Sequence, residues 1–387
     1  MDSSEKLSED KILLNKIIWV IELLGGWPLN KTIKQTVLFI GAITYYVIHL
    51  SISCTALINV LGNLQLMTAN LMETTVQIIS LIRLIYLKLS PRVKESIISI
   101  QQTLDTQKCD NASEEEIYVY YLSIAKRYYS VLMTFSATTS FMFYLRPLPE
   151  CFLAWLNNQP VILKPPYEII YVCFNLTSIE QVIIVYIYQA PMSFLPLGYI
   201  AIINLKLLII TNICSQLGVL SHRIRNLRTI GNDKIFGSIV RNHLKLWRLV
   251  KNIDNAWTLV FCFELMLSTL LCSFVFYGAL LAISVGESVV AVSLITYVIS
   301  SLLILFSNCL MGEMLKYESE NFENALYCLE WYDMSISNKR ALLICMTRAL
   351  FPLQLTAGKF YIYSFNVYTQ IVKFAMGVVS LFRTLSV

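Results

Sequence analysis

Charged residues are scarce in this sequence. Asp, Glu, Lys and Arg make up 14% of its 387 residues, whereas about a quarter of the residues of a soluble domain are charged. Hydrophobic residues make up 56%, and the mean hydropathy is +0.62. This composition excludes an ordinary soluble protein and predicts an all-α membrane protein.

Several other features are missing as well. The sequence has no low-complexity tract, no linker rich in Gly, Ser or Pro and no internal repeat, so we expect a single membrane domain. It lacks the P-loop, GxSxG, HExxH and Gly-rich dinucleotide motifs, which argues against an enzyme. Its three histidines lie far apart and its ten cysteines form no CxxC pair, so we expect no metal site and no cofactor.

Long apolar runs recur along the chain. A membrane-spanning helix needs about 20 mainly apolar residues, and seven segments meet this need. Pro191 and Pro196 would kink the fourth of them. Its start stays open, because the apolar stretch before it is either part of a long broken helix or an outer loop over 146–180. We expect transmembrane helices at 37–60, 66–87, 128–145, 182–208, 255–285, 288–312 and 360–382.

The basic residues predict the orientation. If the N-terminus is cytoplasmic, 26 of the 30 Lys and Arg residues fall in the four inner segments, 1–36, 83–127, 206–251 and 316–359. The positive-inside rule therefore places the N-terminus in the cytoplasm and, after seven spans, the C-terminus outside. The strongly basic stretch 214–251 is typical of contact with acidic membrane lipid, so we expect no nucleic-acid partner.

This orientation bears on three further predictions. It argues against a G-protein-coupled receptor, whose N-terminus is outside, and the sequence also lacks the Asp/Glu-Arg-Tyr and Asn-Pro-x-x-Tyr motifs of that class. Asn175 begins a sequon in the outer loop and is a candidate for glycosylation. Cys151 and Cys173 are candidates for a disulfide, since the outside is oxidising.

Three carboxylates lie close to apolar runs. Glu264 is either a functional carboxylate within the membrane or a residue at the cytoplasmic interface, and its place near the cytoplasmic end of a predicted helix favours the second interpretation. Glu73 and Glu180 fall at the outer ends of predicted helices, where we expect them to be solvated.

The last third of the chain carries a series of short motifs in a fixed order. They are Cys309-Leu-Met-Gly-Glu313, Glu318-Ser319, Ala325-Leu-Tyr327, Trp331-Tyr332, Lys339-Arg340, Leu342 to Arg348, Pro352 to Phe360, Ser364-Phe365 and Ser380-Leu-Phe382. This series, over residues 309–385, resembles the C-terminal signature of the insect odorant receptor family. Ser215 to Leu220 and Arg146 to Pro149 look like two further segments of that family.

The resemblance implies one subunit of a tetrameric, odorant-gated, non-selective cation channel in the plasma membrane of olfactory neurons. Odorant-binding subunits of the family pair with a shared subunit, the odorant receptor co-receptor (Orco). Accordingly we expect a cytoplasmic segment at 1–36, six helices with an odorant pocket in their outer half at 37–312, a cytoplasmic segment that anchors the subunits at 313–359 and a pore-lining helix at 360–387.

The ligand that the resemblance implies is small, volatile and apolar, so we expect a pocket of apolar and aromatic side chains that binds it by shape. Some candidates recur on one face of a predicted helix, as Ala137, Ser140 and Tyr144 do at i, i+3 and i+7. For each candidate, ordinary packing between helices is the competing interpretation. The candidates are Thr75, Val76, Ile79, Ala137, Ser140, Tyr144, Met192, Phe276 and Tyr297.

Candidates for the pore and for the subunit anchor follow from the same resemblance. Gly377, Leu381 and Thr384 share one face of the last predicted helix and are the candidates for the pore or its gate. Leu381 stands where an aromatic residue is common in the family, and Arg383 where threonine is common. Either Arg383 is turned away from the pore, or few copies of this subunit enter a mixed tetramer. The anchor candidates are Trp331, Tyr332, Pro352, Thr356, Gly358 and Lys359.

A second interpretation stays open, namely a seven-helix membrane receptor or a transporter without a pore of its own. Transporters favour broken helices that meet within the membrane, and Pro191 and Pro196 fit that pattern. A ligand-gated current that needs neither nucleotide nor G protein would discriminate between these interpretations and a channel.

Overall fold

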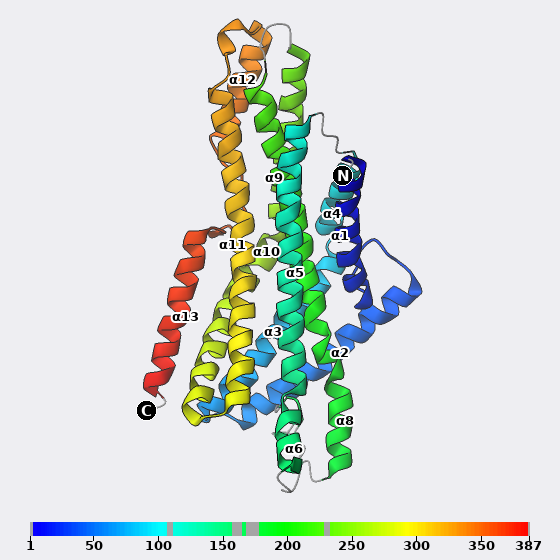
Figure 1. Ribbon diagram of the computed structural model, residues 1–387, viewed down its shortest axis with the longest axis vertical. Coiled ribbons are helices and arrows are strands. Elements are labelled where there is room, and N and C mark those ends of the chain that lie inside the picture. Colours follow the sequence, from blue (N-terminus) through cyan, green and yellow to red (C-terminus); the bar gives the residue numbers. More distant parts are fainter. Residues whose placement is uncertain (1–2, 107–110, 157–164, 168–177, 228–232, 386–387) are drawn as a thin grey trace.

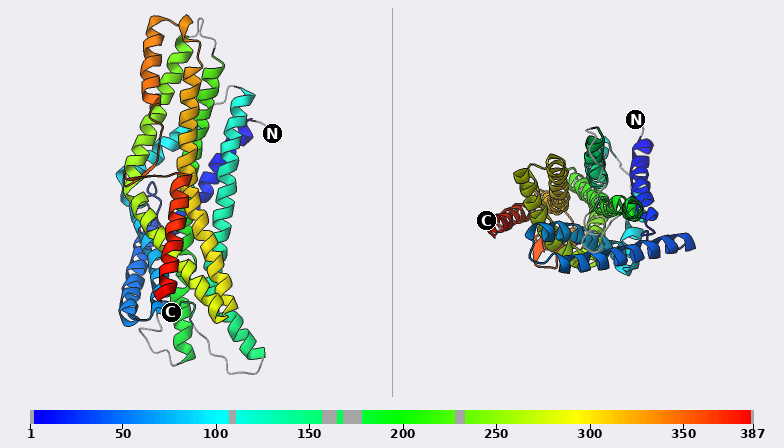
Figure 2. Two further views of the ribbon diagram at one scale, coloured as in Figure 1. Left: turned by 90° about the vertical axis from the view of Figure 1, so that its left-hand side faces the viewer. Right: turned by 90° about the horizontal axis from the view of Figure 1, so that it is seen from below.

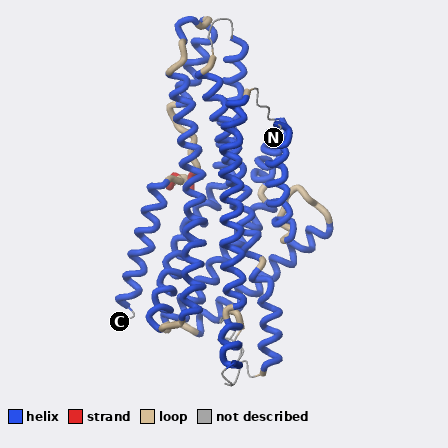
Figure 3. Tube along the Cα trace, in the orientation of Figure 1, coloured by secondary structure: helices blue, strands red, loops and turns tan. Residues whose placement is uncertain are grey.

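The computed structural model describes residues 3–106, 111–156, 165–167, 178–227 and 233–385. Within this part the chain is almost entirely helical, and one short two-stranded hairpin is the exception. Figures 1 and 3 show the helices gathered into one elongated bundle. The predicted all-α architecture is therefore confirmed.

Most of the helices are long and run along the bundle. In chain order the helical elements are α1 (Ser3–Leu23), α2 (Ile33–Asn59), α3 (Leu64–Leu89), α4 (Pro91–Thr106), α5 (Ala112–Leu145), α6 (Pro147–Leu156), α8 (Ile179–Gln189), η1 (Ala190–Ser193), α9 (Leu195–Arg225), α10 (Asp233–Val285), α11 (Ser288–Tyr327), η2 (Trp331–Asp333), α12 (Ile336–Ala349) and α13 (Phe365–Leu385). The strands β1 (Thr356–Ala357) and β2 (Tyr361–Ile362) form an antiparallel pair just before α13.

Helix α9 lies at the centre of the bundle. It packs against α1, α3, α5 and α11, and every residue from Gly198 to Ser215 is buried. Helices α10 and α11 form a long pair beside it, and α13 stands against this pair at the edge of the bundle (Figures 1 and 2). Most of the surface of α13 is therefore not covered by its own chain.

Helices α10 and α11 are longer than a membrane is thick. They contain 53 and 40 residues, which correspond to about 80 Å and about 60 Å of helix. The hydrocarbon core of a bilayer is only about 30 Å thick. These helices therefore extend well beyond one side of any bilayer that holds their apolar halves. We call this extension the stalk, at the upper end of Figure 1; it comprises residues 212–227, 233–253, 315–327 and 331–353.

Several helices are suited to cross a membrane. In the described part of the chain, five helical stretches are long and apolar enough, namely Ile33–Asn59, Ile179–Arg225, Lys234–Val285, Ser288–Tyr327 and Phe365–Phe382. Two further predicted spans correspond to α3 and α5, which are helical but more polar. The chain is thus a multi-pass membrane protein, whereas the count of seven spans stays a prediction.

Short local signals explain where helices begin and break. Ser178 opens α8 with a capping box, in which its side chain accepts the backbone N–H of Gln181. Pro191 lies in the 3-10 turn η1 and Pro196 in the first turn of α9, because a proline ring does not continue the hydrogen bonds of a helix. The break predicted near these prolines is confirmed. Gly286, with a φ of 82°, makes the tight turn between α10 and α11 at a conformation that favours glycine.

Several helices are longer than the predicted spans, because polar residues continue apolar helices beyond them. Helix α5 begins at Ala112 instead of residue 128, α9 continues to Arg225, and α11 continues to Tyr327. The predicted outer loop at 146–180 contains α6 and the start of α8. Hydropathy detects the apolar part of a helix but not the turns that extend beyond it.

The last predicted helix begins too early. Residues 356–362 instead form the β1–β2 hairpin, in which Thr356 pairs with Ile362. Gly358 and Lys359, at its tip, both have a φ of 63°. Asp254 of α10 accepts hydrogen bonds from the backbone N–H and the hydroxyl of Thr356, at 2.7 and 2.9 Å. The hairpin is thus fixed to α10, and α13 begins only after it.

Candidate functional site

A cavity of about 670 Å³ lies between α2, α3, α5, α9 and α11, in the half of the bundle away from the stalk. Its walls are mainly apolar and aromatic, with Ile79 of α3, Phe143 of α5 and Tyr297 of α11 among the lining side chains. Pockets that hold small organic molecules have this size and character.

Hydroxyl groups from three helices also line the cavity. Ser80, Thr139 and Ser301 each donate a hydrogen bond to a carbonyl of their own helix, at 2.7–2.8 Å. These hydroxyls therefore do not leave buried donors without a partner, and their lone pairs can still accept hydrogen bonds.

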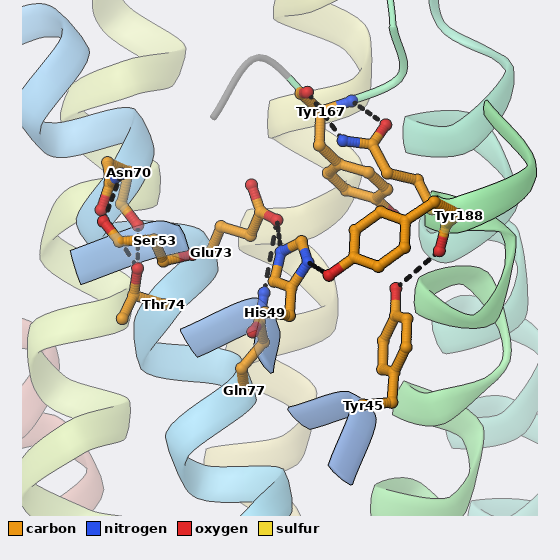
Figure 4. A network of polar contacts seen from close by, with 10 residues as sticks. Tyr45, His49, Ser53, Asn70, Glu73, Thr74, Gln77, Tyr167 and Tyr188 are labelled. Carbon is orange, nitrogen blue, oxygen red and sulfur yellow. Dashed lines mark hydrogen bonds and ion pairs between the residues drawn. The ribbon is translucent and has the colours of Figure 1, made fainter. Parts of the chain in front are cut away.

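A polar network forms one wall of the cavity (Figure 4). Oε1 of Glu73 lies 3.1 Å from Nε2 of His49 and 3.3 Å from Nε2 of Gln77. His49 is fully buried, and its Nδ1 lies 3.4 Å from the hydroxyl of Tyr188. The network joins α2, α3 and α8. The expectation that Glu73 is solvated at an outer helix end is therefore wrong: its side chain is 13% exposed and lines the cavity, whereas Glu180 is exposed as expected.

A short segment outside the helices is held against the same cavity. The side-chain amide of Gln189, which is fully buried, accepts the backbone N–H of Tyr167 at 3.2 Å and donates to its carbonyl at 3.0 Å. Pro166 and Tyr167 both line the cavity. This pair of hydrogen bonds fixes the 165–167 segment although no helix contains it.

Comparison with known proteins decides the family. The family model of the 7tm odorant receptors matches residues 63–376. The chain belongs to the odorant receptor family. The resemblance drawn from the C-terminal motifs is thereby confirmed, and so is the prediction that the chain is not an enzyme, because members of this family are receptors and ligand-gated channels.

Relatives of the receptor agree in sequence and in fold. It is 24% identical to odorant receptor 9a of Drosophila melanogaster over 244 residues, which are 62% of this chain and 61% of that protein. The match therefore spans less than two thirds of that relative. The fold is similar to that of the olfactory receptor OR5 from Machilis hrabei, at 16% identity. The TM-score is 0.82 for OR5 in complex with eugenol, over 98% of this chain and 99% of that one. For OR5 alone it is 0.80, over 97% and 98%.

The structure brings some of the pocket candidates of the receptor together and leaves others apart. Thr75 donates to a carbonyl of its own helix, Ala137 lines a separate, more open hollow, Tyr144 donates to a backbone carbonyl of α8, and Phe276 packs in an apolar cluster. The candidates that line the cavity are Val76, Ile79, Ser140, Met192 and Tyr297. Their contact with a ligand stays a prediction.

The pore candidates of the receptor all lie on the exposed side of α13. Leu381 is 57% exposed, Thr384 is exposed, and a Cβ atom added to Gly377 would meet no atom within 4 Å. The opposite face of α13, which includes Ile371 and Ala375, is buried against the same chain. The three candidates are therefore available to a neighbouring subunit or a pore, and their role stays a prediction.

The anchor candidates of the receptor fall into two groups. The hairpin residues Thr356 and Gly358 bond to α10 of the same chain, the second through its N–H to the carbonyl of Thr258 at 2.8 Å. These two residues hold the hairpin within the subunit. The remaining candidates are half-buried or exposed, and a neighbouring subunit can reach them; they are Trp331, Tyr332, Pro352 and Lys359.

Sequence reasoning missed a cluster of charged side chains inside the bundle of the receptor. Glu264 of α10 forms ion pairs with Arg83 of α3 and with Lys206 of α9, the second at 3.1 Å, and the three side chains are at most 4% exposed. Asn308 of α11 also donates to Glu264. The carboxylate of Glu264 is therefore buried and paired inside the bundle, and its placement at the cytoplasmic interface stays a prediction. Arg83 and Lys206, counted above as cytoplasmic charges, are likewise buried.

Aromatic rings complete this cluster and connect it to its surroundings. The guanidinium of Arg83 lies 4.0 Å from the ring centroid of Tyr199, and the ammonium of Lys206 lies 4.6 Å from that of Phe261. Because two cations meet one carboxylate, these ring faces help to stabilise the excess positive charge. Tyr199 also lines the cavity, and Tyr363, just before α13, donates to the carbonyl of Phe261 at 3.1 Å. The cluster thus lies between the cavity and the start of α13.

Two predictions concern the loop before α8. Asn175 and Cys173 lie outside the described residues, so glycosylation of Asn175 and a disulfide between Cys151 and Cys173 stay predictions. Within the ranges that the structure describes, no group of three or more His, Cys, Asp or Glu residues could hold a metal ion.

Proposed function

We propose that this receptor is the odorant-binding subunit of a heteromeric, odorant-gated, non-selective cation channel. Its partner is the shared odorant receptor co-receptor (Orco), and its site is the dendritic plasma membrane of olfactory neurons. The observation that carries the proposal is the mainly apolar cavity of about 670 Å³, whose few polar groups suit a small volatile molecule. OR5 of Machilis hrabei, which shares the fold, is solved in complex with eugenol, and this supports an odorant as the ligand.

The proposed channel has seven spans for each subunit, with the N-terminus in the cytoplasm and the C-terminus outside. The positive-inside rule supports this orientation, since 26 of the 30 Lys and Arg residues fall in the inner segments. The stalk then lies in the cytoplasm, and the cavity lies in the outer half of the bundle, where a volatile molecule arrives.

Exposed apolar side chains support assembly into a tetramer. On the stalk, Trp331, Ile336, Leu343, Ile344 and Phe351 are 55–75% exposed in the single chain. Large apolar patches on a cytoplasmic surface mark sites of protein contact, so we propose that the stalks of neighbouring subunits bury them against one another. The exposed face of α13 from each subunit would then line a common pore.

We propose that the charged cluster couples the ligand to this pore. A ligand that displaces Tyr199 also displaces the guanidinium of Arg83 on its ring, and with it Glu264 and α10. Through Phe261 and Tyr363 this movement reaches the start of α13. The ligand must bind the open arrangement more tightly than the closed one, and a 100-fold preference supplies about 2.7 kcal/mol for each site.

The proposal is tested by recording whole-cell currents from cells that express this chain with and without the co-receptor, against a broad panel of volatiles. We expect a rapid inward cation current that needs both subunits and persists when G proteins are blocked. Surface expression of both subunits without current to any volatile would overturn the channel proposal. Uptake of a labelled volatile in its place would favour a transporter.

A further inference from the structure

The cavity contains a feature that a purely apolar ligand would not use. Among the residues that the structure describes, two charged side chains line it: Arg146 at the C-terminal end of α5 and Glu73 within α3. A charged group in an apolar cavity is expensive to desolvate unless a partner compensates it. Glu73 has such partners, and it places a hydrogen-bond acceptor in a cavity whose walls are otherwise mainly apolar.

The carboxylate of Glu73 is held in place before any ligand arrives. A carboxylate only accepts hydrogen bonds, so the hydrogen atoms in its contacts come from Nε2 of His49 and from Nε2 of Gln77. The ring of His49 packs against those of Tyr45 and Tyr188, with both centroid distances at 5.9 Å, and the two tyrosine rings lie 5.5 Å from each other. The two tyrosine rings restrict the position of the His49 ring, and the His49 ring in turn holds the carboxylate of Glu73 (Figure 4).

A carboxylate held in this way discriminates between ligands. It can accept about four hydrogen bonds, so the bonds from His49 and Gln77 do not prevent a ligand from donating another. An ether or carbonyl oxygen placed against it brings no hydrogen atom and is repelled. The hydroxyls of Ser80, Thr139 and Ser301 select less strictly, because each can turn its hydrogen from the carbonyl of its own helix to an acceptor on a ligand.

We propose that the cavity selects ligands that carry one hydrogen-bond donor, an alcohol or phenol hydroxyl, on an otherwise apolar body, and that Glu73 accepts this hydrogen bond. The inference rests on the proposed function in so far as this cavity is the ligand site. It adds to the proposed function the chemical class of the ligand and the residue that recognises the ligand's hydroxyl group.

The test compares ligand pairs in which a methyl group replaces the hydroxyl hydrogen. The full-length receptor is purified with its co-receptor, and its thermal unfolding is followed against octanol or methyl octyl ether, and against para-cresol or para-methylanisole. In each pair the ether keeps the oxygen and the apolar body but cannot donate. We expect the alcohol and the phenol to bind at least about tenfold more tightly than their ethers, as a hydrogen bond to a charged group provides.

Two variants connect this preference to Glu73. Glu73→Gln keeps the shape of the side chain but removes its charge, and we expect the preference to fall to about threefold or less, since a charge-assisted hydrogen bond is about twice as strong as a neutral one. Glu180→Gln is the matched control. Glu180 is exposed on α8, so its loss of charge should leave the preference unchanged.

Three results would overturn the inference. The first is equal binding of alcohol and ether by the wild-type protein. The second is tighter binding of octan-2-one than of octanol, which would assign recognition to Arg146. The third is a preference for the alcohol that Glu73→Gln leaves intact. If Glu73→Gln does not fold, the wild-type comparison still decides. Currents recorded with the same probes separate the two proposals: a donor preference in binding without any current overturns the channel, whereas current with equal potency for alcohol and ether overturns only the role of Glu73.

Discussion

The two halves of the bundle are packed in different ways. Around the cavity the buried apolar side chains form three small, separate clusters, whereas one large continuous core fills the stalk and the middle of the bundle. A continuous core is close-packed and resists deformation. The small clusters leave room for a ligand between them. The close-packed half that contains the stalk therefore supports a half in which helices surround a space.

Two glutamates make the same contrast in electrostatic terms. The side chain of Glu264 is 2% exposed and forms ion pairs with Arg83 and Lys206. That of Glu73 is 13% exposed, faces the cavity and bonds to His49 and Gln77. The first carboxylate holds three helices together by charge, and the second is placed where a ligand can reach it.

The largest effect is expected from removing the charge of Glu264. Glu264→Gln would leave Arg83 and Lys206 buried without a counter-charge, and breaking a buried ion pair in this way costs about 3–5 kcal/mol. We expect a strongly lowered unfolding temperature of the purified receptor and little protein at the cell surface.

The control is Glu320→Gln on the stalk. Glu320 is 48% exposed and lies 3.8 Å from Lys316, and an exposed pair of this kind contributes less than about 1 kcal/mol. Equal losses of stability in the two variants would contradict the distinction between a charge-stabilised interior and a solvated stalk surface.

A smaller effect is expected where α11 meets the segment before α13. A Cβ atom at Gly312 would collide with the backbone carbonyl of Tyr363. We expect Gly312→Ala to destabilise the receptor by about 1–3 kcal/mol, as overpacking does in a close-packed core, and to reduce the current that reaches α13. Thermal unfolding and whole-cell recording measure these two effects.

Gly237→Ala is the matched comparison for this change, because a Cβ atom there would meet nothing within 4 Å. Alanine favours a helix over glycine by up to about 1 kcal/mol, so this variant should be neutral or slightly more stable. Destabilisation of both variants by the same amount would show that the contact with Tyr363 is not the cause.

Much of the bundle could be predicted from the sequence as a set of segments, but not as a set of contacts. Apolar runs identified where α2, α3 and α9 to α11 lie, and local motifs identified the family. The pairing of Arg83, Lys206 and Glu264 depends on how three helices are rotated about their axes. Segment-level hydropathy holds no information on that rotation, so each charge was assigned to the nearest interface.

The cavity shows the same limit at the scale of one residue. On α5 the candidates Ala137 and Tyr144 lie on a face of the helix that does not reach the cavity. The cavity is lined instead by Ser136, Thr139, Ser140 and Phe143. The lining set also has helical spacing, but it is displaced by one residue, or about 100° around the helix. Both faces of α5 carry apolar and small residues, so the sequence alone could not show which face lines the cavity without knowledge of the neighbouring helices.

Substitutions on these two faces of α5 would sharpen the comparison. Ser140→Phe places a phenyl ring in the cavity, so we expect at least about tenfold weaker binding of octanol, about 1.4 kcal/mol, with stability nearly unchanged. Ala137→Phe extends into the separate, open hollow and should change octanol binding by less than about twofold, well within the scatter of surface substitutions. Thermal-shift titrations of both variants measure this. Loss of binding in Ala137→Phe alone would move the ligand to the other hollow.

The smallest effect concerns a buried acid that lacks the counter-charges of Glu264. Asp10 of α1 is 3% exposed, and burial raises the pKa of its carboxyl to about 7, although Lys126 opposes the shift. Because the folded pKa lies above the unfolded value, folding favours the protonated form. Stability is therefore fully present below about pH 4 and is lost as the pH rises through 7, by about 1 kcal/mol between pH 6 and pH 8. Asp10→Asn should remove this part of the pH dependence and be more stable than the wild type at pH 8. Unfolding temperatures of the two proteins that fall in parallel over this range would assign the pH dependence to another group.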